Sequence, residues 1–442
     1  MMKTALQTIL RVSKMSKDFK ISSTSTILPM TIIGVLFFIF GFLTWLNGSL
    51  IPFLKAICDL NEFEALFVTF VFYIAYTVMA LPMSFVIEKI GYKNSMALGL
   101  AIMAVGSLLF IPAAQRESFT LFLLALFALG SGLTILQTAS NPYIVCIGPI
   151  ESAAMRISIM GLINKGAGVI APLLFTAFIL SGIGSLEDLS AESKEELASK
   201  LIVPYIVMAL LLSSLIALVK FSKLPELEFE KDEAGEQKKS IFAFPRVVLG
   251  AAALFFYVGI EVIAGDTIGL YGQHLGLTNV TSLTSYVMSF MVLGYALGVL
   301  LIPKYLSQER ALIGSALFGV LFLFGVVASS QSHGISEILW GWSGIRTLPN
   351  TVAFVALLGF ANALVWPTIW PLALEGLGKY TAQGSALLIM AIAGGAILPL
   401  LFGKISHVSG DMQSTYLMGI ICYLFILLYA LKWHKIKSWN EM

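Results

Sequence analysis

The chain contains 442 residues, of which 58% are hydrophobic and only 12% are charged, and its formal net charge is +2. The charged share is about half that of a soluble globular domain, so the composition excludes an ordinary water-soluble fold. The small net charge, without a basic cluster interleaved with aromatic residues, gives no support to nucleic acid as a partner.

The N-terminal segment, residues 1–26, is hydrophilic and carries five Lys and Arg residues. It lacks the apolar core and the cleavage site of a signal peptide. We therefore interpret it as a cytoplasmic tail, with Met15 as an alternative start of translation to Met1.

Twelve long apolar runs follow, and each can supply the roughly 20 residues that a helix needs to cross a bilayer. They are 27–54, 65–87, 94–115, 118–150, 157–186, 201–219, 247–273, 275–303, 311–332, 347–374, 380–403 and 412–431. Because hydrocarbon cannot hydrogen-bond to a bare backbone, we expect every run to be a helix. The predicted fold class is an all-α integral membrane protein with twelve transmembrane helices.

The basic residues predict the orientation of these spans. If both chain ends lie inside, the inner segments hold 20 of the 27 Lys and Arg residues, the outer segments hold six, and Lys165 lies within a span. An excess on one side is what the positive-inside rule describes. We therefore predict a multi-pass protein of the plasma membrane, in a bacterium the inner membrane, with both termini cytoplasmic.

A hydrophilic stretch between Lys220 and Arg246 separates six runs from six. Its mixed charge and few apolar residues are typical of a flexible linker. The predicted domains are a cytoplasmic tail 1–26, a first six-helix half 27–220, a cytoplasmic linker 221–246, a second six-helix half 247–434 and a cytoplasmic tail 435–442.

The two halves repeat several features. Gln137 lies five residues before Pro142, and Asn362 lies five residues before Pro367, both within uncharged runs. Two further pairs of segments echo each other at similar offsets, 166–174 with 394–401 and 37–41 with 255–259. Polar groups and helix breakers at matching points of two halves are typical of a transporter with a site near the bilayer midplane. We expect two pseudo-symmetric halves that rock about a central cavity.

This organisation resembles the major facilitator superfamily. The turn Glu88-Lys89-Ile90-Gly91-Tyr92-Lys93 resembles a degenerate form of the superfamily's cytoplasmic signature. The resemblance implies a gating role for Glu88, Lys89, Gly91 and Lys93.

Three segments narrow the resemblance to the fucose permease family of sugar symporters. They are Trp45-Leu46-Asn47-Gly48-Ser49-Leu50-Ile51-Pro52-Phe53, Leu136-Gln137-Thr138-Ala139-Ser140-Asn141-Pro142-Tyr143 and Trp366-Pro367-Thr368-Ile369-Trp370-Pro371-Leu372. The third segment is more similar to the glucose/galactose and N-acetylglucosamine branches than to fucose carriers. The resemblance implies import of a monosaccharide by cation-coupled symport with alternating access.

Three charged residues lie inside the predicted spans. Glu261 and Asp266 have no basic neighbour in their run, and an unpaired carboxylate in lipid is costly, so we expect them to face water, to be protonated or to bind a cation. Five residues apart, they point roughly 140° from each other on a helix. Lys165 requires a carboxylate partner or a lowered pKa. We interpret all three as a cation-coupling site. The alternative for the two acids is a hydrogen bond that packs one helix against another, and the alternative for Lys165 is a lysine that only balances charge in a water-filled cavity.

The chain departs from the family pattern at two positions. The fucose carrier has an aspartate and a glutamate, both associated with proton coupling, where this chain has Gly48 and Gln137. Neither residue can titrate. Since Gly48 maps onto Asp266 under the offset between the halves, we hypothesise that the coupling carboxylate has moved to the second half.

Recognition of a sugar needs amides for its hydroxyl groups and aromatic faces for its C–H side. The candidate substrate-binding residues share these chemistries and lie inside the spans; they are Asn47, Gln137, Asn141, Asn164, Tyr257, Asn362, Trp366 and Trp370. Asn141 has an alternative role as the cap of a broken helix, and Trp370 as an anchor at the membrane interface.

Other classes of function find little support. Cys58, Cys146 and Cys422 have no metal or disulfide spacing, and no nucleotide-binding loop is present. We expect neither enzymatic activity nor a cofactor. The expected coupling ion is H⁺ or Na⁺, and sodium at Glu261 or Asp266 is the one metal that the sequence allows. We expect a monomer in the lipid bilayer that binds a small sugar. An uncoupled sugar facilitator and a non-transporting sugar sensor are the alternatives.

Overall fold

The computed structural model describes residues 27–146, 153–180, 191–222, 224, 240–302, 305–375, 377 and 380–441. The predicted tail 1–26 and most of the predicted linker 221–246 lie outside the described residues. Within the described ranges the chain is helical, and twelve helical segments are long and apolar enough to cross a membrane. The predicted fold class and number of spans are confirmed.

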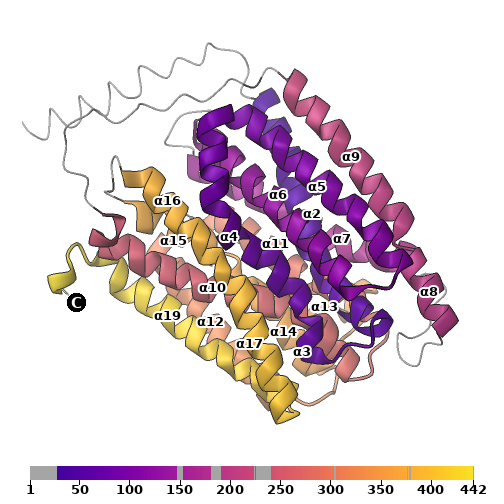
Figure 1. The fold of residues 1–442 in the computed structure, drawn as a ribbon. Coiled ribbons are helices and arrows are strands. Elements are labelled where there is room, and N and C mark those ends of the chain that lie inside the picture. Colours follow the sequence, from indigo (N-terminus) through magenta and orange to yellow (C-terminus); the bar gives the residue numbers. More distant parts are fainter. Residues whose placement is uncertain are drawn as a thin grey trace, which may run out of the picture.

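The first half contains six spans. Its helices are α2 (Ile27–Ile57), α3 (Glu62–Ala65) with α4 (Phe67–Ile90), α5 (Tyr92–Gln115), α6 (Phe119–Cys146), α7 (Ala153–Ile179), and α8 (Ala191–Ser199) with α9 (Ile202–Phe221). Figure 1 shows these helices, indigo to magenta, packed together on one side of the molecule.

The second half also contains six spans, several of them interrupted. Its helices are α10 (Pro245–His274), α11 (Thr284–Leu301), α12 (Gln308–Ala328), α13 (Gly334–Trp340), α14 (Asn350–Asn362) with α15 (Val365–Leu374), α16 (Thr381–Met390) with α17 (Gly394–Ser409), and α18 (Met412–Thr415) with α19 (Gly419–Leu431). Short 3₁₀ turns complete it at Ile241–Ala243 (η2), Val280–Ser282 (η3), Gly341–Ser343 (η4), Ala391–Ala393 (η6), Tyr416–Met418 (η7), Trp433–Lys435 (η8) and Trp439–Glu441 (η9).

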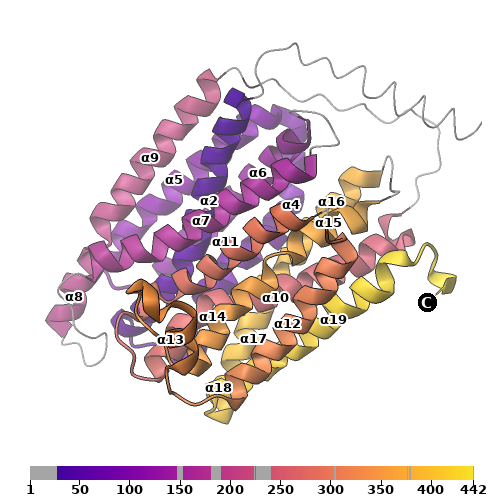
Figure 2. The ribbon, with the colours of Figure 1, turned by 180° about the vertical axis from the view of Figure 1, so that it is seen from behind.

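Helices of the two halves meet pairwise at the interface. Helix α2 packs against α10, α7 against α11, and α4 against α17. Figure 2 shows α7 beside α11. Within each half the same pairing recurs, since α2 packs on α7 and α10 on α17. This repetition is the pseudo-symmetry that the sequence echoes predict.

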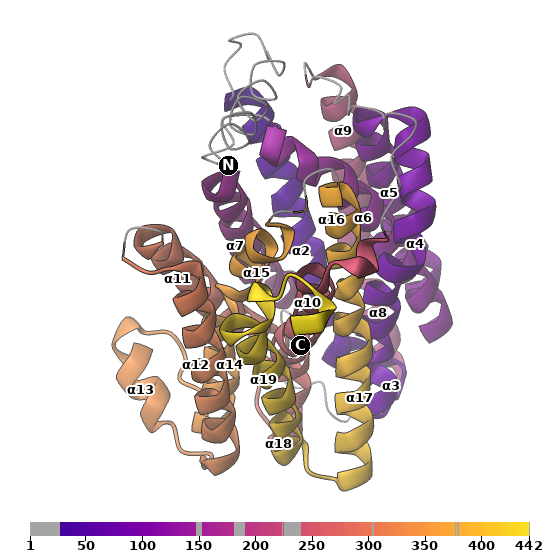
Figure 3. The ribbon, with the colours of Figure 1, turned by 90° about the vertical axis from the view of Figure 1, so that its left-hand side faces the viewer.

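The two ends of the bundle differ in how tightly the halves close. We call the end where α2 begins and α19 ends the terminal side, and the opposite end, with α3, α13 and α18, the distal side (Figure 3). Every residue from Trp45 to Leu54 in α2 and from Tyr257 to Gly272 in α10 is buried, and both segments run from the middle of the bundle toward the distal side. Partly exposed residues occur throughout the terminal-side parts of the same helices. The interface is therefore closed on the distal side.

Two predicted helix breaks have different outcomes. The span with Pro367 is interrupted at Ala363–Leu364, between α14 and α15. Helix α6 instead runs without interruption through Pro142 to Cys146. A proline removes one backbone donor, which a helix can tolerate when neighbouring helices compensate. The matching prolines thus produce a break in the second half only.

Candidate functional site

An ion pair joins the two halves at the middle of the interface. Nζ of Lys165, in α7, lies 2.6 Å from Oε1 of Glu261, in α10, and the two side chains are 10% and 8% exposed. Each buried charge therefore has a partner of opposite sign, as charges buried in a protein require. Of the two acids considered from the sequence, Lys165 therefore pairs with Glu261.

Asp266 points to a different helix, as its angular offset from Glu261 predicts. The Thr69 hydroxyl of α4 donates a hydrogen bond of 2.9 Å to its Oδ2 atom. The residue is fully buried, and Oδ1 has no hydrogen-bond partner within the described part of the chain. Since a buried charge without a cation is costly, this closed arrangement favours the protonated carboxyl.

Gly48 lies against Gly265, the residue before Asp266, where α2 crosses α10. A Cβ atom at Gly48 would lie 2.8 Å from the carbonyl oxygen of Gly265 and 2.2 Å from Oγ1 of Thr284. No side chain fits there without moving α2 away from α10. This close approach explains in physical terms why the position is occupied by glycine and not by an acid.

The candidate amides lie on four helices. Gln137 donates to the Tyr76 hydroxyl at 2.9 Å, and Asn164 donates to the carbonyl of Phe37 at 3.3 Å. Asn362 accepts a 2.8 Å hydrogen bond from the Tyr423 hydroxyl.

Several buried donors in this region have no partner. Among the described residues, they include Nε1 of Trp45, Nδ2 of Asn47, Nδ2 of Asn362 and Nε1 of Trp370. An indole N–H can only donate, so it needs an acceptor. Buried polar groups in proteins are normally satisfied, so these N–H groups are candidates to donate to a bound ligand.

The candidate aromatic residues form one continuous surface. The Tyr257 and Trp366 ring centroids are 6.3 Å apart, and those of Trp366 and Trp370 are 5.5 Å apart. An indole anchored at the membrane interface has its N–H in water, whereas that of Trp370 is buried. The packing therefore favours the site interpretation of Trp370 over the interfacial one.

The candidate gating turn lies on the terminal side. Gly91 has a φ of +81° between α4 and α5, a backbone conformation that favours glycine. Lys93 donates a 2.7 Å hydrogen bond to the carbonyl of Ser222, at the end of α9, and Lys89 is exposed. The side chains of Glu88 and Asn141 lie outside the described residues.

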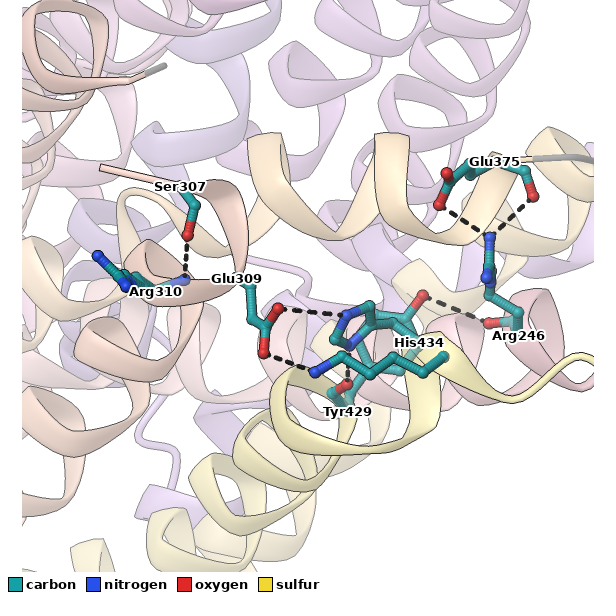
Figure 4. A network of polar contacts seen from close by, with 8 residues as sticks. Arg246, Ser307, Glu309, Arg310, Glu375, Tyr429 and His434 are labelled. Atoms are coloured by element: carbon teal, nitrogen blue, oxygen red, sulfur yellow. Dashed lines mark hydrogen bonds and ion pairs between the residues drawn. The ribbon is translucent and has the colours of Figure 1, made fainter. Parts of the chain in front are cut away.

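A second polar cluster on the terminal side belongs to the second half alone (Figure 4). Lys435 lies 2.8 Å from Glu309 and His434 lies 3.8 Å from it, so the C-terminal segment is tied to the start of α12. Arg246, at the start of α10, pairs with Glu375 at 2.9 Å. Partly exposed pairs of this kind contribute little stability individually, and they fix helix ends rather than form a binding site.

A metal centre finds no support in the described part of the chain, where no three His, Cys, Asp or Glu residues are grouped. Burial raises the pKa of the Cys58 thiol to about 11, so this cysteine stays protonated. A cavity of about 370 Å³ between α10 and α16 has an apolar lining that includes none of the candidate residues.

Four residues that contact the candidate site residues are not predicted from the sequence. Trp45, Thr69, Tyr76 and Tyr423 contact Lys165, Asp266, Gln137 and Asn362, respectively. Trp45 stands two residues before Asn47 in one of the family-like segments, which was the available signal. The other three are single hydroxyl groups in apolar spans, and no spacing distinguishes them from packing residues.

Comparison with known proteins identifies related chains along nearly the whole length. The profile of the Major Facilitator Superfamily matches residues 33–400. A glucose/galactose transporter of Brucella abortus biovar 1 (strain 9-941) is 33% identical over 408 residues, covering 91% of this chain and 93% of the relative. A putative glucose/galactose transporter of Helicobacter pylori (strain J99) is 33% identical and covers 93% of this chain and 98% of the relative.

More distant similarities include fucose carriers. An L-fucose-proton symporter of Escherichia coli (strain K12) is 26% identical, covering 92% of this chain and 93% of the relative. A crystal structure of the transporter FucP in the outward conformation has a TM-score of 0.69 at 24% identity, covering 92% of this chain and 99% of that chain. The structural likeness supports the twelve-helix fold.

Proposed function

The chain belongs to the Major Facilitator Superfamily, in the fucose permease family of sugar transporters, and we propose that it imports a hexose together with a cation. The terminal side faces the cytoplasm in this proposal, as the positive-inside distribution of Lys and Arg indicates. The distal side faces the exterior of a bacterial cell, and the fold moves substrate by alternating access.

One observation carries the proposal for a sugar ligand. The buried N–H groups of Asn47, Asn362 and Trp370 have no partner within the described residues. A polyhydroxylated, uncharged ligand supplies several acceptors at once and an apolar C–H face for Trp366 and Trp370. We include Gln137, Asn141, Asn164 and Tyr257 in the same substrate site.

The substrate class is a hexose such as glucose or galactose, with N-acetylglucosamine as the alternative. Two of the more similar relatives carry the name glucose/galactose transporter, and the tryptophan-rich segment 366–372 supports the same choice. Neutral amides and indoles suit neutral sugars better than charged substrates.

Coupling is assigned to Asp266 and to the Lys165–Glu261 pair. A proton fits Asp266 better than sodium does, because its neighbour Thr69 supplies one hydroxyl oxygen and Na⁺ needs several oxygen ligands. Distant relatives are named L-fucose-proton symporters, which supports the same ion. Coupling through Asp266 replaces the titratable groups that Gly48 and Gln137 cannot provide.

The proposal is tested with purified protein in liposomes. Labelled glucose, galactose, fucose and N-acetylglucosamine are offered in parallel under an imposed proton gradient or an imposed sodium gradient. We expect accumulation of a hexose above its external concentration under the proton gradient. Equilibration without accumulation would identify a facilitator, and binding without uptake a sensor.

Replacing either Gln137 or Asn362 with alanine is expected to weaken sugar binding. Each amide already has a tyrosine partner that orients it, so the loss removes a positioned hydrogen bond worth roughly 1–3 kcal/mol, or about 5- to 150-fold in affinity. Calorimetric titration with the transported sugar measures the change. Asn94→Ala, an exposed amide at the terminal-side end of α5, is the matched control and should leave affinity unchanged. Unaltered affinity in both test variants would remove these residues from the site.

A further inference from the structure

Trp45 of α2 lies where helices of both halves meet, immediately distal to the ion pair. Its side chain is 2% exposed. Gly168 of α7 and Gly265 of α10 lie against its ring, and Met288 of α11 packs beside both glycines. The indole is thus held between a helix of its own half and a helix of the other.

The two glycines leave the space that the indole fills. A Cβ atom at Gly168 would lie 2.7 Å from Cδ1 of Trp45, and one at Gly265 would lie 2.5 Å from its Cζ3. These separations are too short for carbon atoms in a packed interior, so a side chain at either position must displace the ring or separate the helices. Gly166, one position before Ala167 in the same helix, has open space around it instead.

The same ring also contacts the ion pair. Nζ of Lys165 lies 4.3 Å from the ring centroid and 2.6 Å from Oε1 of Glu261. A cation is attracted to the face of an indole, so the position of the ring depends on where the ammonium group lies. Lys165 precedes Gly168 by three residues, and Glu261 precedes Gly265 by four, so each charge and its glycine share one helix face. Each half therefore places one member of the ion pair near Trp45 and, about one helical turn further toward the distal side, a glycine against its ring.

Polar contacts close the interface distal to Trp45. The Ser49 hydroxyl donates to the carbonyl of Thr281 at 2.5 Å, and the hydroxyl groups of Thr176 and Thr281 are 2.7 Å apart. Thr69 donates to Asp266, the residue that follows Gly265. All of these contacts cross from the first half to the second. A displaced indole would push α10 and η3 away from these partners.

We infer that Trp45 is a positioning residue that makes closure of the distal side depend on an intact Lys165–Glu261 pair. With the pair formed, the ammonium group holds the ring in the space between Gly168 and Gly265, and the halves close over it. When the pair separates, Glu261 no longer fixes the ammonium group over the ring, and the distal contacts lose their support. This inference rests on the proposed transport function, to which it adds the link between coupling and closure.

The test measures how readily Thr281, which is fully buried, becomes accessible. Thr281→Cys is introduced into the full chain with Cys58, Cys146 and Cys422 replaced by serine, and the labelling rate with a water-soluble maleimide is measured in nanodiscs. Gly168→Ala is expected to raise this rate about tenfold, because overpacking disfavours the closed state. Gly166→Ala, which meets no atom within 4 Å, is the matched control and should change the rate by less than about twofold.

Substitutions of Trp45 itself complete the test if Gly168→Ala fails to fold. Trp45→Leu removes the aromatic face and should raise labelling, whereas Trp45→Phe retains a face for Lys165 and should stay near the parent rate. In the Trp45→Leu background, Gly168→Ala should have a smaller additional effect, because the overlap with the Trp45 ring is gone and only that with Cγ of Met288, at 2.9 Å, remains. Equal rates for Gly168→Ala and Gly166→Ala, or for Trp45→Leu and the parent, would overturn the inference.

The labelling measurement needs neither sugar nor an ion gradient. If no sugar is accumulated but the glycine and tryptophan variants behave as expected, the proposed function fails while the structural link stands. If sugar is accumulated but the variants label like the parent, the link fails and the transport function stands.

Discussion

Lys165→Met is expected to abolish coupled sugar uptake and to destabilise the protein by about 3–5 kcal/mol, because it leaves Glu261 buried without a cation. The double variant Lys165→Met/Glu261→Gln should recover most of the lost stability, since replacing a buried pair with neutral groups of similar size is often nearly neutral. It should not recover accumulation of sugar, because the switch between the halves is absent.

Thermal unfolding of the purified variants measures the first effect, and gradient-driven uptake in liposomes measures the second. Lys404→Met is the matched control, since Lys404 is an exposed lysine of α17. A single variant as stable as the parent would show that Glu261 does not depend on Lys165. A double variant that accumulates sugar normally would remove the pair from the coupling mechanism.

Asp266→Asn is expected to eliminate accumulation while exchange of labelled for unlabelled sugar persists. The amide cannot release a proton, yet it has the size of the carboxyl and retains an acceptor for the Thr69 hydroxyl. The distal-closed arrangement buries Asp266 completely, and a neutral side chain is suited to that environment. The variant should therefore be at least as stable as the parent.

Counterflow in liposomes without an ion gradient measures exchange, and uptake under a proton gradient measures accumulation. Asp59→Asn is the control, because Asp59 is an exposed aspartate that pairs with Lys194 at the distal surface. Accumulation at the parent level in Asp266→Asn would assign coupling elsewhere. Loss of both activities would indicate that Asp266 serves sugar binding rather than ion coupling.

The sequence predicts the fold well because the lengths of the apolar runs indicate the spans, and the distribution of basic residues indicates their orientation, along the whole chain. A backbone that crosses lipid must form a helix, so the twelve spans follow from the positions and lengths of the apolar runs. The echo of Gln137 with Asn362 likewise predicts two halves. The break at Ala363–Leu364 and the uninterrupted α6 differ because compensation for a proline depends on neighbouring helices, which sequence does not reveal.

The candidate site is predicted in part. The angular offset between Glu261 and Asp266 predicts two different partner helices, and the structure has α7 and α4 in these roles. Which acid pairs with Lys165 depends on tertiary packing. Trp45 was missed because its contacts with Gly168 and Gly265 join positions more than 100 residues apart in sequence.

The most direct test of proton-coupled hexose transport is movement of protons caused by sugar alone. Liposomes that contain the purified protein and a trapped pH indicator receive hexose outside, with no initial ion gradient and with sodium absent. We expect acidification of the lumen with the parent protein and none with Asp266→Asn. Hexose uptake by the parent protein without any change in internal pH would contradict proton-coupled transport.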